Sequence, residues 1–134
     1  RVPTIERQYY EEIVKGMRAA VTGGTCRIAG SILPGVEVCG KTGTAQNRGK
    51  DHSAFMGFAP MNNPKIAIAV YVENGGFGAT YGVPIGALMM DQYLHGKLSP
   101  ENEKLAEDFS NRIMEDIGLG DNTALPSPYH CRMV

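Results

Sequence analysis

The chain has 134 residues, of which 43% are hydrophobic, and this size and composition are typical of one globular domain with its own core. Its 13 Lys and Arg residues nearly balance its 14 Asp and Glu residues, and the net charge of -1 argues against a broad electrostatic interaction with nucleic acid or anionic lipid. The longest apolar run spans residues 66–72, well short of the ~20 residues that a membrane-spanning helix needs. We therefore expect no segment of this chain to cross a bilayer.

The first predicted element is a helix close to the N-terminus, which Thr4 can cap and which Gly23-Gly24 ends. Its apolar side chains recur every fourth residue and form one stripe along the helix. These residues are Ile5, Tyr9, Ile13, Met17 and Val21. Residues 25–35 mix glycine and proline with apolar residues, which predicts a loop packed over the body of the domain rather than regular structure.

Three strands are predicted next, over residues 36–46, 52–60 and 65–73. Short connections that form turns separate them, which is typical of antiparallel neighbours and predicts a meander. Nearly every residue of the third strand is apolar, so we expect this strand to be covered on both faces. It should then lie in the centre of a larger sheet.

Two further helices are predicted after the strands. Pro84 opens the first of them and Gly96 can close it. Ser99-Pro100 is an N-terminal signal for the second, which Gly118 ends.

Together these elements predict an α+β fold, in which an antiparallel sheet of at least three strands is flanked by helices. We assign residues 1–120 to this folded portion. Residues 121–134 contain two prolines and few apolar side chains, which predicts an irregular C-terminal tail.

The motif Lys41-Thr42-Gly43-Thr44 lies in the first predicted strand. A cation, two hydroxyls and a glycine within four residues at a sheet edge are suited to holding a carboxylate beside an approaching backbone. The alternative interpretation is a solvated lysine and two ordinary strand-forming threonines at an edge. The flanking sequence decides between them.

That flanking sequence, over residues 41–46, 52–60 and 62–76, closely resembles the C-terminal part of the transpeptidase domain of class B penicillin-binding proteins. Within that family it is most similar to the cell-elongation type, penicillin-binding protein 2. Lys-Thr-Gly belongs to the signature of such enzymes, together with Ser-x-x-Lys and a Ser-containing third motif. The resemblance extends over roughly residues 1–95, so residues 1–120 are interpreted as the C-terminal portion of such a domain.

The resemblance implies a role for each residue of the motif. Lys41 would raise the local positive potential and support the proton network around a nucleophilic serine. The hydroxyls of Thr42 and Thr44 would donate to the carboxylate of the substrate or of penicillin. Gly43 would leave room where the strand meets the catalytic helix, and the N–H of Thr44 would be an oxyanion-hole donor.

The activity implied is a peptidoglycan D,D-transpeptidase, which cross-links cell-wall stem peptides through an acyl-serine intermediate. None of the five serines has a lysine three positions later, and the chain starts at Arg1. We therefore interpret the chain as a piece of a larger serine enzyme and expect it to be inactive alone. Two alternatives stay open: a fragment of a serine β-lactamase or D,D-carboxypeptidase, and a non-catalytic module that senses penicillin.

The same resemblance implies the partners and the location. The partners are peptidoglycan stem peptides, β-lactam antibiotics and other cell-wall elongation proteins, without nucleic acid and without a cofactor. The location is the periplasmic side of the bacterial cytoplasmic membrane, with an N-terminal anchor that these residues do not include. An uncovered strand edge would in addition allow the fragment to associate with itself.

Other candidate residues have structural interpretations. Cys26, Cys39 and Cys131 match neither a redox nor a zinc-ligand spacing and are expected to be free thiols. Residues 75–78 lack the pattern of a phosphate-binding loop. His52 is expected to be a hydrogen-bonded structural histidine at the start of a strand, with a place beside the motif as the alternative.

Overall fold

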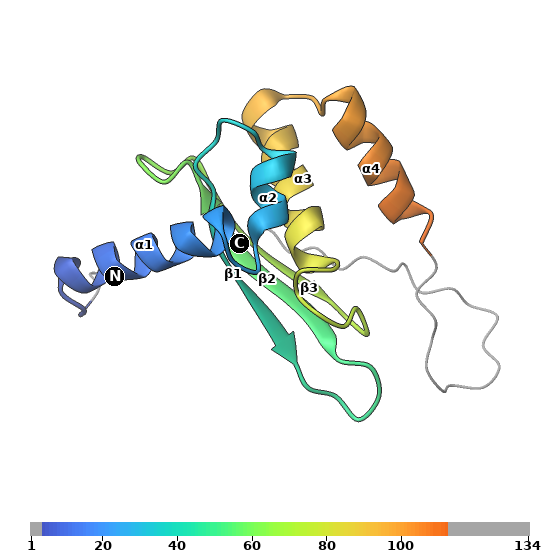
Figure 1. Ribbon diagram of the computed structural model, residues 1–134, viewed down its shortest axis with the longest axis horizontal. Coiled ribbons are helices and arrows are strands. Elements are labelled where there is room, and N and C mark those ends of the chain that lie inside the picture. Colours follow the sequence, from blue (N-terminus) through green and yellow to red (C-terminus); the bar gives the residue numbers. More distant parts are fainter. Residues whose placement is uncertain (1–3, 113–134) are drawn as a thin grey trace.

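The computed structural model of the chain describes residues 4–112. Four helices and three strands follow one another in these residues, and Figure 1 shows their arrangement. Their bounds are α1 Arg7–Thr22, α2 Arg27–Ile32, β1 Cys39–Ala45, β2 His52–Ala59, β3 Ile66–Val72, α3 Gly82–His95 and α4 Pro100–Ser110. The predicted boundary between residues 120 and 121, and the tail beyond it, lie outside the described residues.

The three strands form one antiparallel sheet in the order β1-β2-β3. The predicted meander and the α+β class are therefore confirmed. In the register, Thr42 of β1 lies opposite Phe55 of β2, which in turn lies opposite Val70 of β3. β1 is shorter than predicted, because residues 36–38 precede the ladder instead of extending it.

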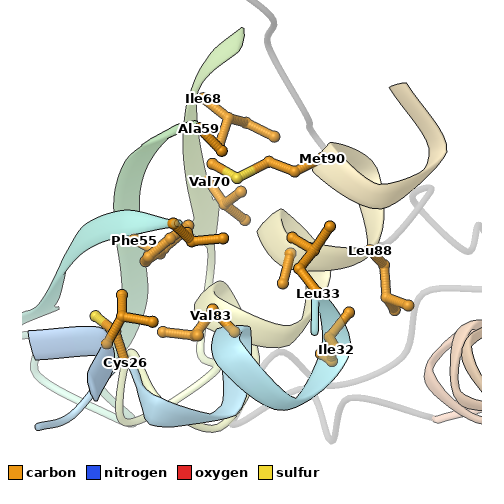
Figure 2. Close-up of a cluster of buried hydrophobic side chains, with 14 of the residues drawn as sticks. Cys26, Ile32, Leu33, Phe55, Ala59, Ile68, Val70, Val83, Leu88 and Met90 are labelled. Atoms are coloured by element: carbon orange, nitrogen blue, oxygen red, sulfur yellow. The ribbon is translucent and has the colours of Figure 1, made fainter. Parts of the chain in front are cut away.

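On one face of the sheet, α3 packs against β2 and β3, and α2 packs in turn against α3 and α1 (Figure 1). The main core lies between the sheet and these helices. Figure 2 shows Phe55 of β2 in this layer together with Val83 and Met90 of α3. Phe55 packs against glycine backbone: a Cβ at Gly40 would lie 2.5 Å from its ring and one at Gly86 would lie 2.6 Å from it. Only residues without side chains let β1 and α3 approach the ring this closely.

The other face of the sheet is open within the described residues. Met56 of β2 is 58% exposed and Tyr71 of β3 is 48% exposed. In β3 the buried Ile68 and Val70 therefore alternate with exposed residues. The expectation that β3 is covered on both faces is wrong for this chain, because Ala67, Ala69 and Tyr71 are exposed on its second face. β3 is an edge strand here, so its central place in a larger sheet stays a prediction.

The N-terminal helix differs from its prediction at its start. α1 begins at Arg7, and Glu6 occupies the N-cap without a side-chain hydrogen bond, so Thr4 does not cap it. Val21 is the one residue of the predicted stripe that is buried, whereas Ile5 and Ile13 are more than half exposed. Figure 1 shows the reason, since the N-terminal part of α1 extends past the sheet.

The short helix α2 replaces the loop that was predicted over residues 25–35. Its six residues are too few to show a helical period, and Gly30 masks the pattern further. Ala29 and Ile32 are buried, and α2 packs against α1 and α3. Tertiary packing therefore stabilises this helix where local propensity does not.

The two C-terminal helices agree with their predicted signals. Gly96 ends α3 in the left-handed conformation, with φ 77°. At the start of α4, the Asn102 backbone N–H donates to the Ser99 hydroxyl over 3.2 Å. α3 begins at Gly82, two residues before Pro84, and the predicted end at Gly118 lies outside the described residues. No helix within residues 4–112 combines the length and apolar character needed to cross a membrane.

Candidate functional site

The motif Lys41-Thr42-Gly43-Thr44 occupies the middle of β1, and β1 is an edge strand of the described sheet. The predicted edge position is therefore confirmed. Lys41 and Thr44 are exposed, whereas Thr42 and Gly43 are partly buried. Within the described residues no strand pairs with the outer edge of β1, and an extended peptide can add to such an edge. The Thr42 backbone is already engaged there, since it bonds with Cys26 and accepts from Lys41.

Lys41 points to the open face of the sheet, since it lies opposite Met56, whose side chain is on that face. Its ammonium donates a hydrogen bond to the carbonyl oxygen of Thr42 over 2.8 Å. No salt bridge involves Lys41 within residues 4–112. Its positive charge is thus neutralised by no described carboxylate.

Thr42 and Thr44 point to the other face, because they lie opposite Phe55 and Ser53, whose side chains are buried there. The structure therefore brings the two hydroxyls to one side of β1 and places the Lys41 ammonium on the opposite side. A ligand at the strand edge lies between the two sides and is within reach of both.

The Thr42 hydroxyl has a partner that lies far away in the sequence. It is 2.8 Å from the hydroxyl of Thr25, which belongs to the turn between α1 and α2. The turn is fixed to α1, because the Cys26 backbone N–H donates to the Ala20 carbonyl oxygen over 2.9 Å. A Cβ at Gly24 would lie 2.8 Å from the Ala20 Cα, so the tight approach of the turn requires glycine.

Cys26 is 0% exposed and lies against the motif. Burial raises the pKa of its thiol, and this outweighs a hydrogen bond with Thr25, the charge of Lys41 and a hydrogen bond with the Thr42 backbone, which lower the pKa. A neutral, buried thiol is a poor nucleophile. Cys26 therefore contributes packing beside β1, as does the buried free thiol of Cys39.

Residues 73–81 follow β3 and lie against the face of β1 and β2 that carries the Thr42 and Ser53 side chains. A Cβ at Gly78 would lie 2.6 Å from the Gly43 carbonyl oxygen and 3.0 Å from the Thr42 Cβ. Any other residue at position 78 would displace the motif strand or this segment. At Gly43 itself, a Cβ would lie 3.3 Å from the Ala54 Cβ on the open face, a tight contact.

Ser53 holds this segment in place. Its hydroxyl donates to the Phe77 carbonyl oxygen over 3.0 Å and accepts from the Gly82 backbone N–H over 3.0 Å. Ser53 is fully buried, and its hydrogen bond with the Gly82 backbone is therefore protected from water. The side chain therefore ties the start of α3 to the part of β2 that lies opposite Thr44.

The other candidate residues are structural. The Nδ1 atom of His52 accepts a hydrogen bond from the Asn74 backbone N–H over 3.0 Å, which confirms the structural interpretation of this histidine. Arg48 and Lys50 lie in the exposed β1–β2 turn. Cys131 lies outside the described residues. No three His, Cys, Asp or Glu side chains in the described part of the chain gather as metal ligands.

A surface hollow of about 690 Å³ lies on α1, α2 and the segment that follows them. Its lining includes Arg18, Arg27 and Glu37 and none of the four motif residues. The candidate site is therefore the exposed edge at β1 rather than this hollow.

Sequence reasoning did not identify Thr25, Ser53 or Gly78 as part of the site. The glycine pair before Thr25 indicates a turn, but nothing local shows that this turn contacts a residue 17 positions later. Ser53 and Gly78 acquire their roles through contacts across the sheet, which a single sequence does not display.

Comparison with known proteins shows the family to which the chain belongs. Residues 1–92 match the family described as the penicillin binding protein transpeptidase domain. The chain is 38% identical over 76 residues to peptidoglycan D,D-transpeptidase PbpA of Mycobacterium tuberculosis, covering 48% of this chain and 15% of that protein.

Two solved structures show the same arrangement of elements. Pseudomonas aeruginosa PBP2, solved in complex with WCK 5153, is 41% identical with a TM-score of 0.64, over 75% of this chain and 23% of that chain. Penicillin-binding protein A of M. tuberculosis, solved as an imipenem acyl-enzyme, is 32% identical with a TM-score of 0.59, over 70% of this chain and 21% of that chain. The chain thus spans less than a quarter of each of these proteins. With two thirds of its length matched by the family, this chain belongs to the penicillin-binding protein transpeptidase domains.

Proposed function

We propose that this chain is the C-terminal portion of a peptidoglycan D,D-transpeptidase and provides the edge of its active site that binds the substrate carboxylate. The observation that carries the proposal is the family motif on an edge strand, with the Thr42 and Thr44 hydroxyls on one side and the Lys41 ammonium on the other. The relative PbpA is named a peptidoglycan D,D-transpeptidase, which favours this activity over that of a β-lactamase or a sensor.

The proposed reaction is acyl transfer between two stem peptides. A serine outside these 134 residues attacks the penultimate D-Ala carbonyl carbon, the terminal D-Ala leaves as a free amine, and an amine of a neighbouring peptide then displaces the serine. Lys41 supplies positive potential and supports proton transfer at that serine. The Thr44 backbone N–H stabilises the developing oxyanion, and Gly43 leaves space for the catalytic helix.

The carboxylate of the leaving D-Ala is the group that Thr42 and Thr44 bind in this proposal. Hydroxyl donors next to a lysine suit a carboxylate, because hydrogen bonds to a charged acceptor are about twice as strong as neutral ones. A β-lactam carries a carboxylate and an acyl group in a similar arrangement, and imipenem forms an acyl-enzyme with the related penicillin-binding protein A. We infer that β-lactams and stem peptides compete for this edge.

A cross-linking enzyme works where peptidoglycan is built, so we place the parent enzyme on the outer, periplasmic side of the cytoplasmic membrane, with an N-terminal anchor. Other cell-wall elongation proteins are its proposed partners. These statements concern the whole enzyme, of which this chain supplies one part of one domain.

Covalent labelling by penicillin tests the proposal. The full-length protein should gain the mass of one penicillin per chain in an intact-mass measurement, and the adduct should persist. The 134-residue chain alone should gain none, because none of its serines is followed by the activating lysine. A full-length protein that stays unlabelled would contradict the proposal, and so would one that rapidly releases hydrolysed penicillin, as a β-lactamase does.

A further inference from the structure

We infer that Thr25 is a positioning residue for the reaction, because its hydroxyl holds the hydroxyl proton of Thr42 toward the carboxylate of the ligand. This inference rests on the proposed function, since it assumes that Thr42 donates to a ligand carboxylate. It adds to the site a residue that lies 16 positions before the Lys-Thr-Gly motif and on a different element.

The first support is geometric. The Thr25 and Thr42 hydroxyl oxygens are 2.8 Å apart, the optimal separation for a hydrogen bond between two hydroxyls. Thr25 stands directly before the fully buried Cys26 and directly after Gly24, whose backbone touches α1. Its backbone therefore has little freedom, and the distance to Thr42 is fixed by the fold rather than by a flexible loop.

A second hydrogen bond fixes α1 to the start of the motif strand. The Arg18 guanidinium of α1 donates to the Val38 carbonyl oxygen over 3.0 Å, immediately before β1 begins. Together with the Thr25–Thr42 contact, this hydrogen bond attaches α1 and its following turn to the motif strand at two points. Thr25 is thus held beside β1 by the body of the domain, which is what a preorganised site requires.

The direction of donation follows from the number of protons that each group carries. A threonine hydroxyl has one proton to donate and two lone pairs that accept, and a carboxylate only accepts. When Thr42 donates its single proton to the ligand, its contact with Thr25 persists only if Thr25 donates to Thr42. The order of donation is then Thr25 to Thr42 to carboxylate, and each hydrogen bond in such a chain strengthens the next.

The neutral Cys26 thiol is consistent with this order. It contacts Thr25 and carries its own proton, so it does not compete as a charged acceptor for the Thr25 proton. Without a ligand, either of the two hydroxyls can be the donor in the Thr25–Thr42 contact, because each can donate and accept. Ligand binding selects one direction.

The test is a double-mutant cycle in the full-length enzyme with Thr25→Val, Thr42→Val and both together. The readouts are the dissociation constant of the reversible penicillin complex and the rate constant of the acylation step. Thr25→Val should weaken the reversible complex by about three- to tenfold, which is the scale of one hydrogen bond, and leave the acylation step nearly unchanged. Thr25→Ser should restore binding, because it keeps the hydroxyl.

The decisive result is whether the effects of Thr25→Val and Thr42→Val on binding depend on each other. If Thr25 acts through Thr42, then Thr25→Val should have no further effect once Thr42→Val is present. Thr22→Val is the matched control, because the exposed Thr22 hydroxyl donates to the Ala19 carbonyl oxygen of its own helix. This variant should change neither the dissociation constant of the reversible complex nor the rate constant of acylation.

Three results would overturn the inference: wild-type binding in Thr25→Val, additive effects in the double variant, or no rescue by Thr25→Ser. If Thr25→Val fails to fold, the same cycle is run with Thr25→Ala, and the same three results would overturn the inference. A wild-type enzyme that penicillin does not acylate would instead remove the proposed function itself, so the two failures are distinguishable.

Discussion

Lys41 and Thr42 are neighbours in β1, yet their side chains leave opposite faces of the sheet. The ammonium lies on the open face and the hydroxyl on the face that Thr25 shares. One edge strand can therefore present a cation to a group packed on the open face and hydroxyls to a ligand along the edge. This division fits a site in which a nucleophile approaches from one side and a carboxylate is held from the other.

Replacing Lys41 tests its proposed role in acylation. In the full-length enzyme, Lys41→Ala should slow acylation by penicillin by about a hundredfold or more, because one lost electrostatic donor at an acyl-transfer site costs ~3 kcal/mol of barrier. The melting temperature should hardly change, since an exposed lysine without a salt bridge contributes under ~0.5 kcal/mol to stability. Acylation kinetics and thermal unfolding are measured on the same samples.

Lys50→Ala is the matched control, because Lys50 is an exposed lysine in the turn after β1 and outside the motif. Its variant should acylate at the wild-type rate. Equal acylation rates in both variants would remove Lys41 from the site.

At the scale of the elements, Asn102 of α4 joins three helices. Its Nδ2 amide donates to the Ile32 carbonyl oxygen of α2 over 2.8 Å and to the Asp91 carboxylate of α3 over 2.7 Å. Both protons of the amide are thus used, and the Asp91 side chain is only 7% exposed. These bonds fix α4 against the layer that covers the sheet.

Asn102→Asp should destabilise the fold by about 1–3 kcal/mol, because an acceptor then faces a carbonyl oxygen and a carboxylate in place of a donor. The loss should shrink as the pH falls from neutral, because the carbonyl oxygen and the Asp91 carboxylate raise the pKa of the introduced carboxyl above its usual ~4, and the protonated group can donate again. Urea unfolding across pH measures this. The exposed turn variant Asn62→Asp is the control, and equal stabilities of the two variants at neutral pH would refute the role of Asn102.

The elements that local patterns specify were predictable, and the elements that packing specifies were not. β2 and β3 have strand-forming sequences between turn residues, and Ser99 is a local cap, so all three were found. α2 has six residues and depends on its burial against α3. The Lys-Thr-Gly motif was visible in the sequence, but its partner Thr25 was not, because their contact is made only by the fold.

The whole molecule has an uncovered sheet face and an uncovered β3 edge within the described residues. An apolar edge with unpaired backbone groups is a template for another strand. The exposed Met56 and Tyr71 add apolar surface on the open face. We therefore expect the isolated 134-residue chain to self-associate.

Light scattering over a concentration series tests this expectation. Ala69→Lys, an exposed position of β3, should lower the apparent mass by placing a charge on the strand. Ala79→Lys introduces the same charge at an exposed loop position and should leave association unchanged. A folded, strictly monomeric wild-type chain at every concentration would show that the open edge and face do not drive association.

In the proposed function, the edge of β1 binds the carboxylate of the substrate or of a β-lactam. A crystal structure of the full-length enzyme acylated by a penicillin would show where this carboxylate lies. We expect it within ~3.2 Å of the Thr42 or Thr44 hydroxyl oxygen, with the acyl carbonyl oxygen at the Thr44 backbone N–H. A covalently bound penicillin whose carboxylate is directed away from β1 would refute the proposed role of this edge.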